Sequence, residues 1–173
     1  KWGAKAGNLW RTTHDIKPFW ASMLAIYEMN VRHYKYAQPG SWNDPDMLEV
    51  GVGKLNMEEN RTHFSLWCMM AAPLILGNDV RKFIKPDGSV DSDNPTYKIL
   101  TNKDVIAINQ DRLGVQCRRV KSNGAEDVLV KPLENNEVDL VSYITPYRKK
   151  LYISKKNIFY KYIILFYINI IKI

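Results

Sequence analysis

The sequence predicts an α/β protein in which a parallel sheet, with strands that alternate with helices, is followed by an antiparallel β region. Up to Asn109, near-continuous apolar runs alternate with stretches of helical spacing, which is typical of strand–helix units. After Asn109, short strand candidates are separated by the turns SNG and ENN, which is typical of antiparallel strands. This change of pattern places a domain boundary near Asp111.

The first elements are predicted in the order helix, strand, helix, strand. Residues 1–7 have the pattern of a helix end, with Gly7 in the stop position, and NLWRTT forms the first strand. The segment 17–37 places apolar residues at helical intervals, and Pro18 lies near its start, where proline is tolerated. SWNDPDM follows the turn QPG and forms the second strand.

The next elements continue the alternation. Asn56 is expected to cap a helix, because Glu59 stands at the capping-box position. One face of this helix is expected to carry Phe64, Trp67, Met70 and Ala71. PLILG then predicts a fully buried strand, NDVRKFI a helix or loop, and NPTYKILTNKDVIAIN a helix followed by a strand. The antiparallel strand candidates are GVQCRRVKS, EDVLVKPL and NEVDLVSYI.

The positive charge is confined to the end of the chain. The net charge is +7, but 7 of the 25 basic residues and none of the 18 acidic ones lie after Tyr147. The part before Arg148 is therefore neutral and has no electrostatic footprint for nucleic acid. Residues 148–173 are rich in Lys, Ile and Tyr, and are interpreted as a low-complexity tail outside the fold. Their apolar run is too short and too interrupted for a membrane span.

The sequence contains few residues that could form a disulfide, bind a metal or carry a glycan. The two cysteines cannot define a disulfide framework, and Cys68, within an apolar run, is expected to be a buried thiol. The histidines His14, His33 and His63 lack the spacing of metal ligands, so no metal and no organic cofactor is expected. Asn60 begins a glycosylation triplet, NRT, which also occurs often by chance.

Charged residues gather where the first two strands end. Arg11 and Asp15 flank the end of one strand, and Asp44 and Asp46 mark the end of the next. In a parallel barrel these ends share one face, where loops collect functional groups. Converging carboxylates with a guanidinium suit glycoside hydrolysis, in which one carboxyl protonates the leaving oxygen and another acts as nucleophile or base. The residues alone equally allow a structural Arg11–Asp15 ion pair beside a capping turn.

Four blocks in the chain, GNLWRTTHDI, PGSWNDPDMLEVG, HFSLWCMMAAPLILGNDV and VIAINQDRLGVQ, resemble consecutive blocks of the melibiase-type α-galactosidases, glycoside hydrolase family 27. The resemblance covers roughly residues 2–133. It implies the second half of a (β/α)8 TIM barrel over residues 1–110 and the start of an antiparallel β-sandwich over residues 111–147. Residues 148–173 would be the tail.

The resemblance also implies roles for single residues. Asp15 matches the general acid/base, and Arg11 matches the arginine that contacts the 2-hydroxyl of the sugar. Asp46 and Met47 match positions that line the substrate pocket, with Asp46 supporting the acid/base end. Asn43 and Asp44 would be structural. His14 stands where the family often has a smaller residue and is expected to face solvent.

The chain departs from the family pattern in one important respect. The nucleophilic aspartate of the family lies on an earlier strand, in a block for which the residues before NLWRTT offer no match. The residues that grip the galactose 4- and 6-hydroxyls are also not found. The chain therefore looks like a portion of the enzyme, and by itself it is expected to be inactive.

The function implied by the resemblance is retaining hydrolysis of terminal α-D-galactosyl residues. The expected partner is an α-galactoside, oligosaccharide or glycoconjugate, with neither nucleic acid nor membrane, and the family favours a secreted or lysosomal/vacuolar location. The alternatives are α-N-acetylgalactosaminidase or isomaltodextran-type activity within the family. Another is a non-catalytic remnant with at most weak sugar binding.

Overall fold

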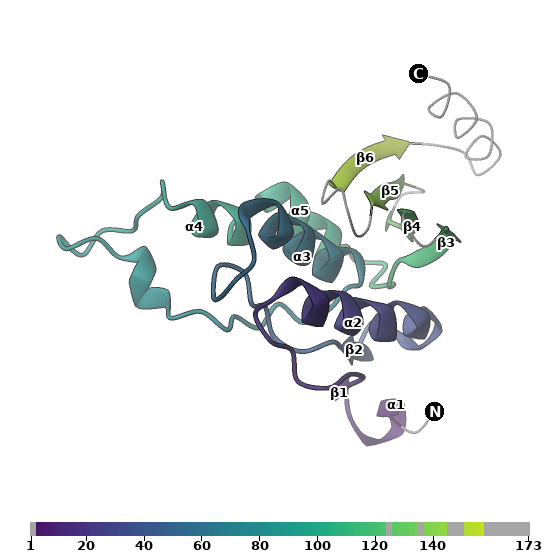
Figure 1. Ribbon diagram of the computed structural model, residues 1–173. Helices are drawn as coiled ribbons and strands as arrows, with labels where there is room; N and C mark the ends of the chain where they lie inside the picture. The colour runs from purple at the N-terminus through teal and green to yellow at the C-terminus, as the bar shows by residue number, and fades with distance from the viewer. Residues whose placement is uncertain (1–2, 124–125, 135–136, 145–150, 158–173) are drawn as a thin grey trace.

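The computed structural model describes residues 3–123, 126–134, 137–144 and 151–157. Two short parallel strands lie beside a layer of helices, and four antiparallel strands form a second sheet (Figure 1). The second sheet lies at one end of the helical layer, and the segment 77–94 projects from the opposite end (Figure 1). The α/β character and the later antiparallel region are therefore as predicted.

The helices and strands have the following bounds. The helical elements are α1 Gly3–Ala6, α2 Trp20–Asn30, the 3-10 helix η1 Val31–Tyr36, α3 Met57–Met69, the 3-10 helix η2 Val80–Phe83, α4 Pro95–Leu100 and α5 Lys103–Asn109. The strands are β1 Leu9–Arg11, β2 Trp42–Asp44, β3 Arg118–Ser122, β4 Glu126–Pro132, β5 Glu137–Ile144 and β6 Leu151–Asn157.

The parallel pair confirms that NLWRTT and SWNDPDM lie side by side. Leu9 pairs with Trp42 and Arg11 with Asp44, so β1 and β2 end at the same edge. The Thr12 N–H extends this register by donating to the Asp44 carbonyl at 2.9 Å. Residues that follow the two strands are thus brought into one neighbourhood.

The prediction of a fully buried strand at PLILG is wrong. Leu76 makes an isolated parallel bridge with Leu48, whose N–H donates to the Ile75 carbonyl at 2.7 Å. The side chains of Ile75 and Leu76 remain 53% and 43% exposed. An apolar run predicts burial only if strands or helices cover both of its sides, and within the described ranges its backbone pairs on the Leu48 side alone.

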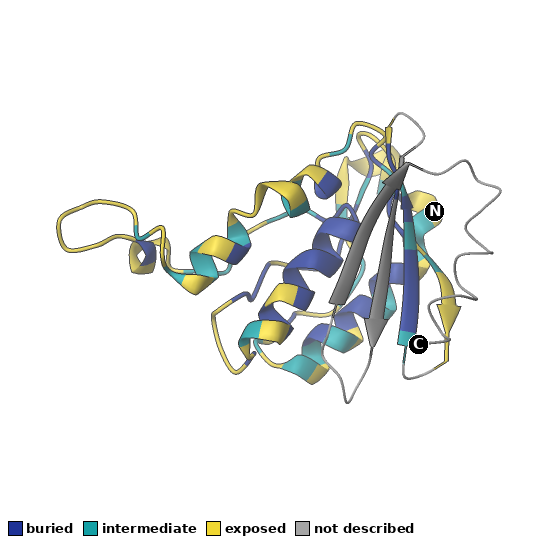
Figure 2. Ribbon diagram, turned by 90° about the horizontal axis from the view of Figure 1, so that it is seen from above, coloured by how far each residue is buried: buried dark blue, intermediate teal, exposed yellow. Residues whose placement is uncertain are grey.

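Helix α3 begins as predicted. Asn56 accepts from the Glu59 N–H at 3.0 Å, and Glu59 accepts from the Asn56 N–H at 2.7 Å, which completes the capping box. The helix ends at Met69, so Met70, its C-cap, and Ala71, with φ +50°, lie outside it. Burial extends around most of α3 rather than along one face, whereas the helical layer as a whole carries buried, intermediate and exposed residues side by side (Figure 2).

Two other helical predictions needed correction. The segment 17–37 splits into α2 and the 3-10 helix η1, and Pro18 lies before the first helical residue. VIAIN, predicted as a strand, belongs to α5. The reason is the cap, because the side chain of Asn102 accepts from the N–H groups of Asp104 and Val105 and so starts a helix.

The antiparallel sheet has the order β3-β4-β5-β6. Its first three strands are those predicted. The fourth, Leu151–Asn157, pairs with β5 from Glu137↔Asn157 to Tyr143↔Leu151. Residues 151–157, which the sequence analysis assigned to the tail, thus form the edge strand of this sheet. Residues 158–173 lie outside the described residues.

The sheet is joined to the helical layer through buried and partly buried polar groups. The Tyr27 hydroxyl donates to Asp127 at 2.7 Å, and Arg119 contacts both Asp127 at 2.8 Å and Glu28 at 2.7 Å. The fully buried Lys131 donates to the Cys68 carbonyl at 3.2 Å. Apolar contact adds to this connection, because one cluster of buried residues includes Met23, Ile26, Leu48, Trp67 and Leu129.

The structure also tests the expectations for two single residues, Cys68 and Asn60. Cys68 is a buried free thiol, as predicted, and Cys117 is another. Asn60 is buried, its amide nitrogen donates to the Leu55 carbonyl at 3.0 Å, and its oxygen accepts from the Gly51 N–H at 2.8 Å. A glycan on Asn60 is incompatible with this packing. Among the residues that the structure describes, no helix is long and apolar enough to cross a membrane.

Candidate active site

The guanidinium of Arg11 joins the two aspartates that the sequence singled out. Its Nη2 lies 3.2 Å from Asp15 Oδ1 and 2.8 Å from Asp46 Oδ2. Arg11 ends β1, and the two aspartates lie in the loops that follow β1 and β2. The shared edge of the parallel strands therefore brings the three side chains together, and this cluster is called the Arg11 cluster below.

The carboxylate of Asp46 has three donors. Besides Arg11, it accepts from the Ile16 N–H at 2.8 Å through Oδ2 and from the Met47 N–H at 2.8 Å through Oδ1. The side chain is 9% exposed, and the residue has φ +89°. A non-glycine residue in this region is strained, and such residues gather at functional sites. Asp46 thus ties the loop after β1 to the loop after β2.

Asn43 and Asp44 have the structural environment expected of them. Asp44 Oδ1 accepts from the Asp46 N–H at 2.8 Å, which closes a tight turn around Pro45. Asn43 accepts from the Trp10 indole at 3.1 Å and donates to the His33 carbonyl and to Gln116 Oε1, both at 2.9 Å. Asp44 thus bonds to the backbone of Asp46, and neither side chain is bonded to the side chains of Arg11, Asp15 or Asp46.

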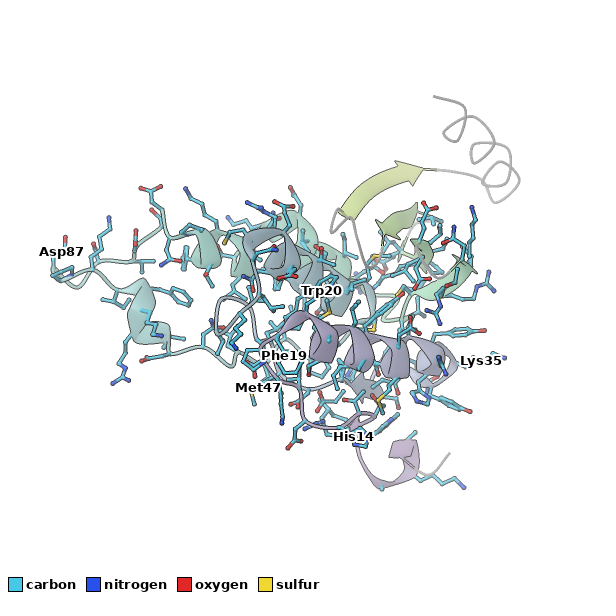
Figure 3. The ribbon with its side chains drawn as sticks, in the orientation of Figure 1. His14, Phe19, Trp20, Lys35, Met47 and Asp87 are labelled. Carbon is cyan, nitrogen blue, oxygen red and sulfur yellow. The ribbon has the colours of Figure 1, made fainter. Side chains whose placement is uncertain are left out.

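The remaining site candidates are open to solvent. The side chain of Asp15 is 92% exposed, and Met47, labelled in Figure 3, is 39% exposed. His14, also labelled, is exposed as predicted (Figure 3). Asp15 is therefore free to meet a substrate, while its orientation depends on Arg11.

A further acid near the cluster was missed by the sequence reasoning. Glu49 is buried, and its pKa is raised because of that burial and of the nearby Asp46 carboxylate. Its backbone N–H donates to His63 Nε2 at 2.9 Å. No sequence pattern marked the Glu49 carboxyl, because the contact with His63 is made by the Glu49 backbone and not by its side chain.

Because His63 is buried, the free energy of unfolding is expected to fall in acid. Burial lowers its pKa from 6.5 to about 3, so the unfolded chain binds a proton in this range that the folded chain does not. The His63 contribution is complete above pH 6.5 and declines by about 1.4 kcal/mol per pH unit as the pH falls toward 3.

Urea unfolding at pH 7, 6, 5 and 4 measures this effect. The free energy of unfolding of the wild type should fall more steeply than that of His63→Gln, in which the titrating ring is replaced. Because both proteins share all other acids, parallel curves would contradict the assignment.

Metal binding finds no support in the described part of the chain, where no group of three or more His, Cys, Asp or Glu residues is placed to hold an ion. The groups present can donate or accept protons and form hydrogen bonds with a polar ligand. The arrangement therefore suits acid–base chemistry on a hydroxylated substrate.

Comparison with known proteins gives one family. A family model described as alpha galactosidase A matches residues 3–111. The chain is 46% identical over 140 residues to alpha-galactosidase 2 of Arabidopsis thaliana, covering 81% of this chain and 33% of that protein. It is 39% identical over 141 residues to the human alpha-N-acetylgalactosaminidase, covering 79% and 32%. The chain thus spans about a third of the length of these relatives.

Solved structures agree. Alpha-galactosidase I from Mortierella vinacea superimposes with a TM-score of 0.72 at 32% identity, covering 82% of this chain and 38% of that one. The alpha-galactosidase from Saccharomyces cerevisiae with raffinose gives 0.61 at 30% identity, covering 70% and 27%. These neighbours are family 27 enzymes with a barrel and a β domain, and the present chain is consistent with part of that barrel.

Proposed function

The chain belongs to the alpha galactosidase A family of glycoside hydrolases, and from this premise we propose that it contributes the acid/base side of an active site for retaining hydrolysis of terminal α-galactosides. The observation that carries the proposal is the Arg11 cluster, in which one guanidinium nitrogen holds both Asp15 and Asp46. Its residues lie in two of the blocks that resemble the family and within the range that the family model matches.

In the proposed mechanism Asp15 first donates a proton to the leaving oxygen and then removes one from water. Its exposure allows contact with both. Arg11 orients Asp15 and offers its remaining N–H groups to the 2-hydroxyl of the sugar, for which a planar guanidinium is suited. Met47, exposed beside Asp46, would line the pocket.

Asp46 is proposed as a support rather than as the nucleophile. Its carboxylate accepts from Arg11 and from two backbone N–H groups, so its lone pairs are already engaged and are poorly available for attack on a substrate carbon. A retaining mechanism needs a second carboxyl about 5 to 5.5 Å from the acid/base. We therefore expect that carboxyl to come from residues other than the Arg11 cluster.

The proposed function also implies how the chain is divided into domains. Residues 1–110 would be the second half of a (β/α)8 barrel, and the antiparallel strands from residue 111 would begin the β-sandwich. The exposed Ile75 and Leu76 support this, because the next barrel strand would cover them. The β6 strand extends the β region beyond the boundary at residue 147 expected from the sequence.

The experiment joins the chain to the part of the Arabidopsis thaliana relative that precedes its region of similarity. This fused enzyme should release p-nitrophenol from the α-galactoside faster than from the α-N-acetylgalactosaminide. The 173-residue chain alone, as control, should release none. The opposite preference would assign α-N-acetylgalactosaminidase, the second activity found among the relatives. A folded but inactive fusion would favour the non-catalytic alternative.

A further inference from the structure

Helix α3 carries three buried side chains that are unusual for a core. Asn60, His63 and Trp67 are 3%, 0% and 0% exposed. Their spacing of three and four residues places them on one face of the helix. Buried amide, imidazole and indole groups need hydrogen-bond partners, so their partners indicate why they are present.

All three bond to the backbone of the segment that follows β2. The Trp67 Nε1–H donates to the Asp46 carbonyl at 2.9 Å, and His63 Nε2 accepts from the Glu49 N–H at 2.9 Å. Asn60 Oδ1 accepts from the Gly51 N–H at 2.8 Å. The two segments run in opposite directions, because the first of the three helix residues binds residue 51 and the last binds residue 46. We call these three bonds the backbone clamp.

The clamp is stiffened at the end nearest the Arg11 cluster. The rings of His63 and Trp67 meet edge to face, with centroids 4.1 Å apart and an interplanar angle of 85°. The indole therefore has little freedom to turn its N–H away from the Asp46 carbonyl. Both residues lie in the interior, where close packing restricts side-chain rotation.

The bound carbonyl belongs to the strained residue of the site. Asp46 has φ +89°, a conformation that persists only when surrounding contacts hold it. With this backbone its carboxylate reaches three donors at once, namely Arg11, the Ile16 N–H and the Met47 N–H. Loss of the indole bond would let Asp46 relax and would weaken all three contacts.

We propose that Trp67 is a positioning residue, which holds Asp46 in its left-handed conformation and thereby orients Arg11 and Asp15, with His63 and Asn60 fixing the rest of the segment. The consequence for catalysis rests on the proposed function. The claim that Trp67 positions Asp46 does not rest on the proposed function, because it concerns only contacts within this chain.

The test is hydrogen exchange of single backbone amides, followed by NMR on the whole chain without substrate. Trp67→Phe keeps an aromatic ring but removes the indole N–H. The Ile16 and Met47 amides, both bonded to the Asp46 carboxylate, should exchange about tenfold faster. The Met70 and Cys117 amides, bonded to the Leu66 and Met69 carbonyls, report on α3 itself and should be unchanged.

Two further variants make the result decisive. Trp10→Phe removes another indole bond, to Asn43 Oδ1, and should leave the Ile16 and Met47 amides unchanged. Benzothienylalanine at position 67 keeps the shape of tryptophan without its N–H, so it reproduces the effect if Trp67→Phe does not fold. Unchanged Ile16 and Met47 exchange in that variant, or an equal increase at all four amides, would overturn the proposal. Because no turnover is measured, an inactive fused enzyme would leave this test unaffected.

Discussion

Asp15→Asn in the fused enzyme is expected to lower kcat/KM for raffinose by about 10²- to 10⁴-fold, the usual contribution of a general acid/base. The amide is nearly isosteric with the carboxyl and can still accept a hydrogen bond from Arg11, so the fold should be kept. It cannot give a proton to a sugar oxygen. Steady-state kinetics with thermal unfolding of both proteins measure the two effects separately.

Asp44→Asn is the matched control for this change. Asp44 lies in the same sequence block as Asp46, but its Oδ1 accepts from the Asp46 N–H and takes no part in the Arg11 cluster. The oxygen of asparagine can accept the same bond. The kcat/KM should therefore stay within about threefold of the wild type. A loss as large as that of Asp15→Asn would contradict the division of roles.

Asp127→Ala is expected to lower the free energy of unfolding by about 3 to 5 kcal/mol, as for other buried ion pairs that lose one partner. Asp127 is 4% exposed and accepts from Tyr27 and Arg119. Its removal leaves the guanidinium of Arg119 with only Glu28 from this network. The pKa of Arg119 is raised by Glu28 and Asp127, which shows that the network favours the charged form.

Urea unfolding of the whole chain measures this change. Arg81→Ala is the control, because the Arg81–Asp79 pair has a similar distance of 2.8 Å but Arg81 is 89% exposed. Exposed pairs contribute little, so no measurable change is expected there. A loss for Asp127→Ala no larger than that of the control would show that the antiparallel sheet is held to α2 by apolar contact alone.

The sequence was sufficient to predict an element where the interaction that determines it is local. The Asn56–Glu59 capping box depends on residues a few positions apart, and it was predicted. VIAIN was predicted wrongly because its β-branched residues outweighed the cap supplied by Asn102. PLILG failed for the opposite reason, since burial depends on distant neighbours that an apolar run does not reveal.

The candidate site was predictable in its members but not in its geometry. Motif position singled out Arg11, Asp15 and Asp46, and the shared edge of β1 and β2 explained why they meet. No pattern indicated that Asp46 would adopt φ +89° or that its carbonyl would bond to Trp67, 21 residues later. Those features arise from the packing of α3 against the loop, which sequence periodicity does not describe.

The dependence of the Asp15→Asn defect on the leaving group tests the central claim, that Asp15 is the acid/base, most directly. A general acid matters most when the leaving oxygen is strongly basic. In the fused enzyme, kcat/KM for 2,4-dinitrophenyl α-galactoside should therefore fall only slightly on substitution, while kcat/KM for raffinose should fall by the full factor. An equal loss on both substrates would contradict the assignment and make Asp15 a binding residue.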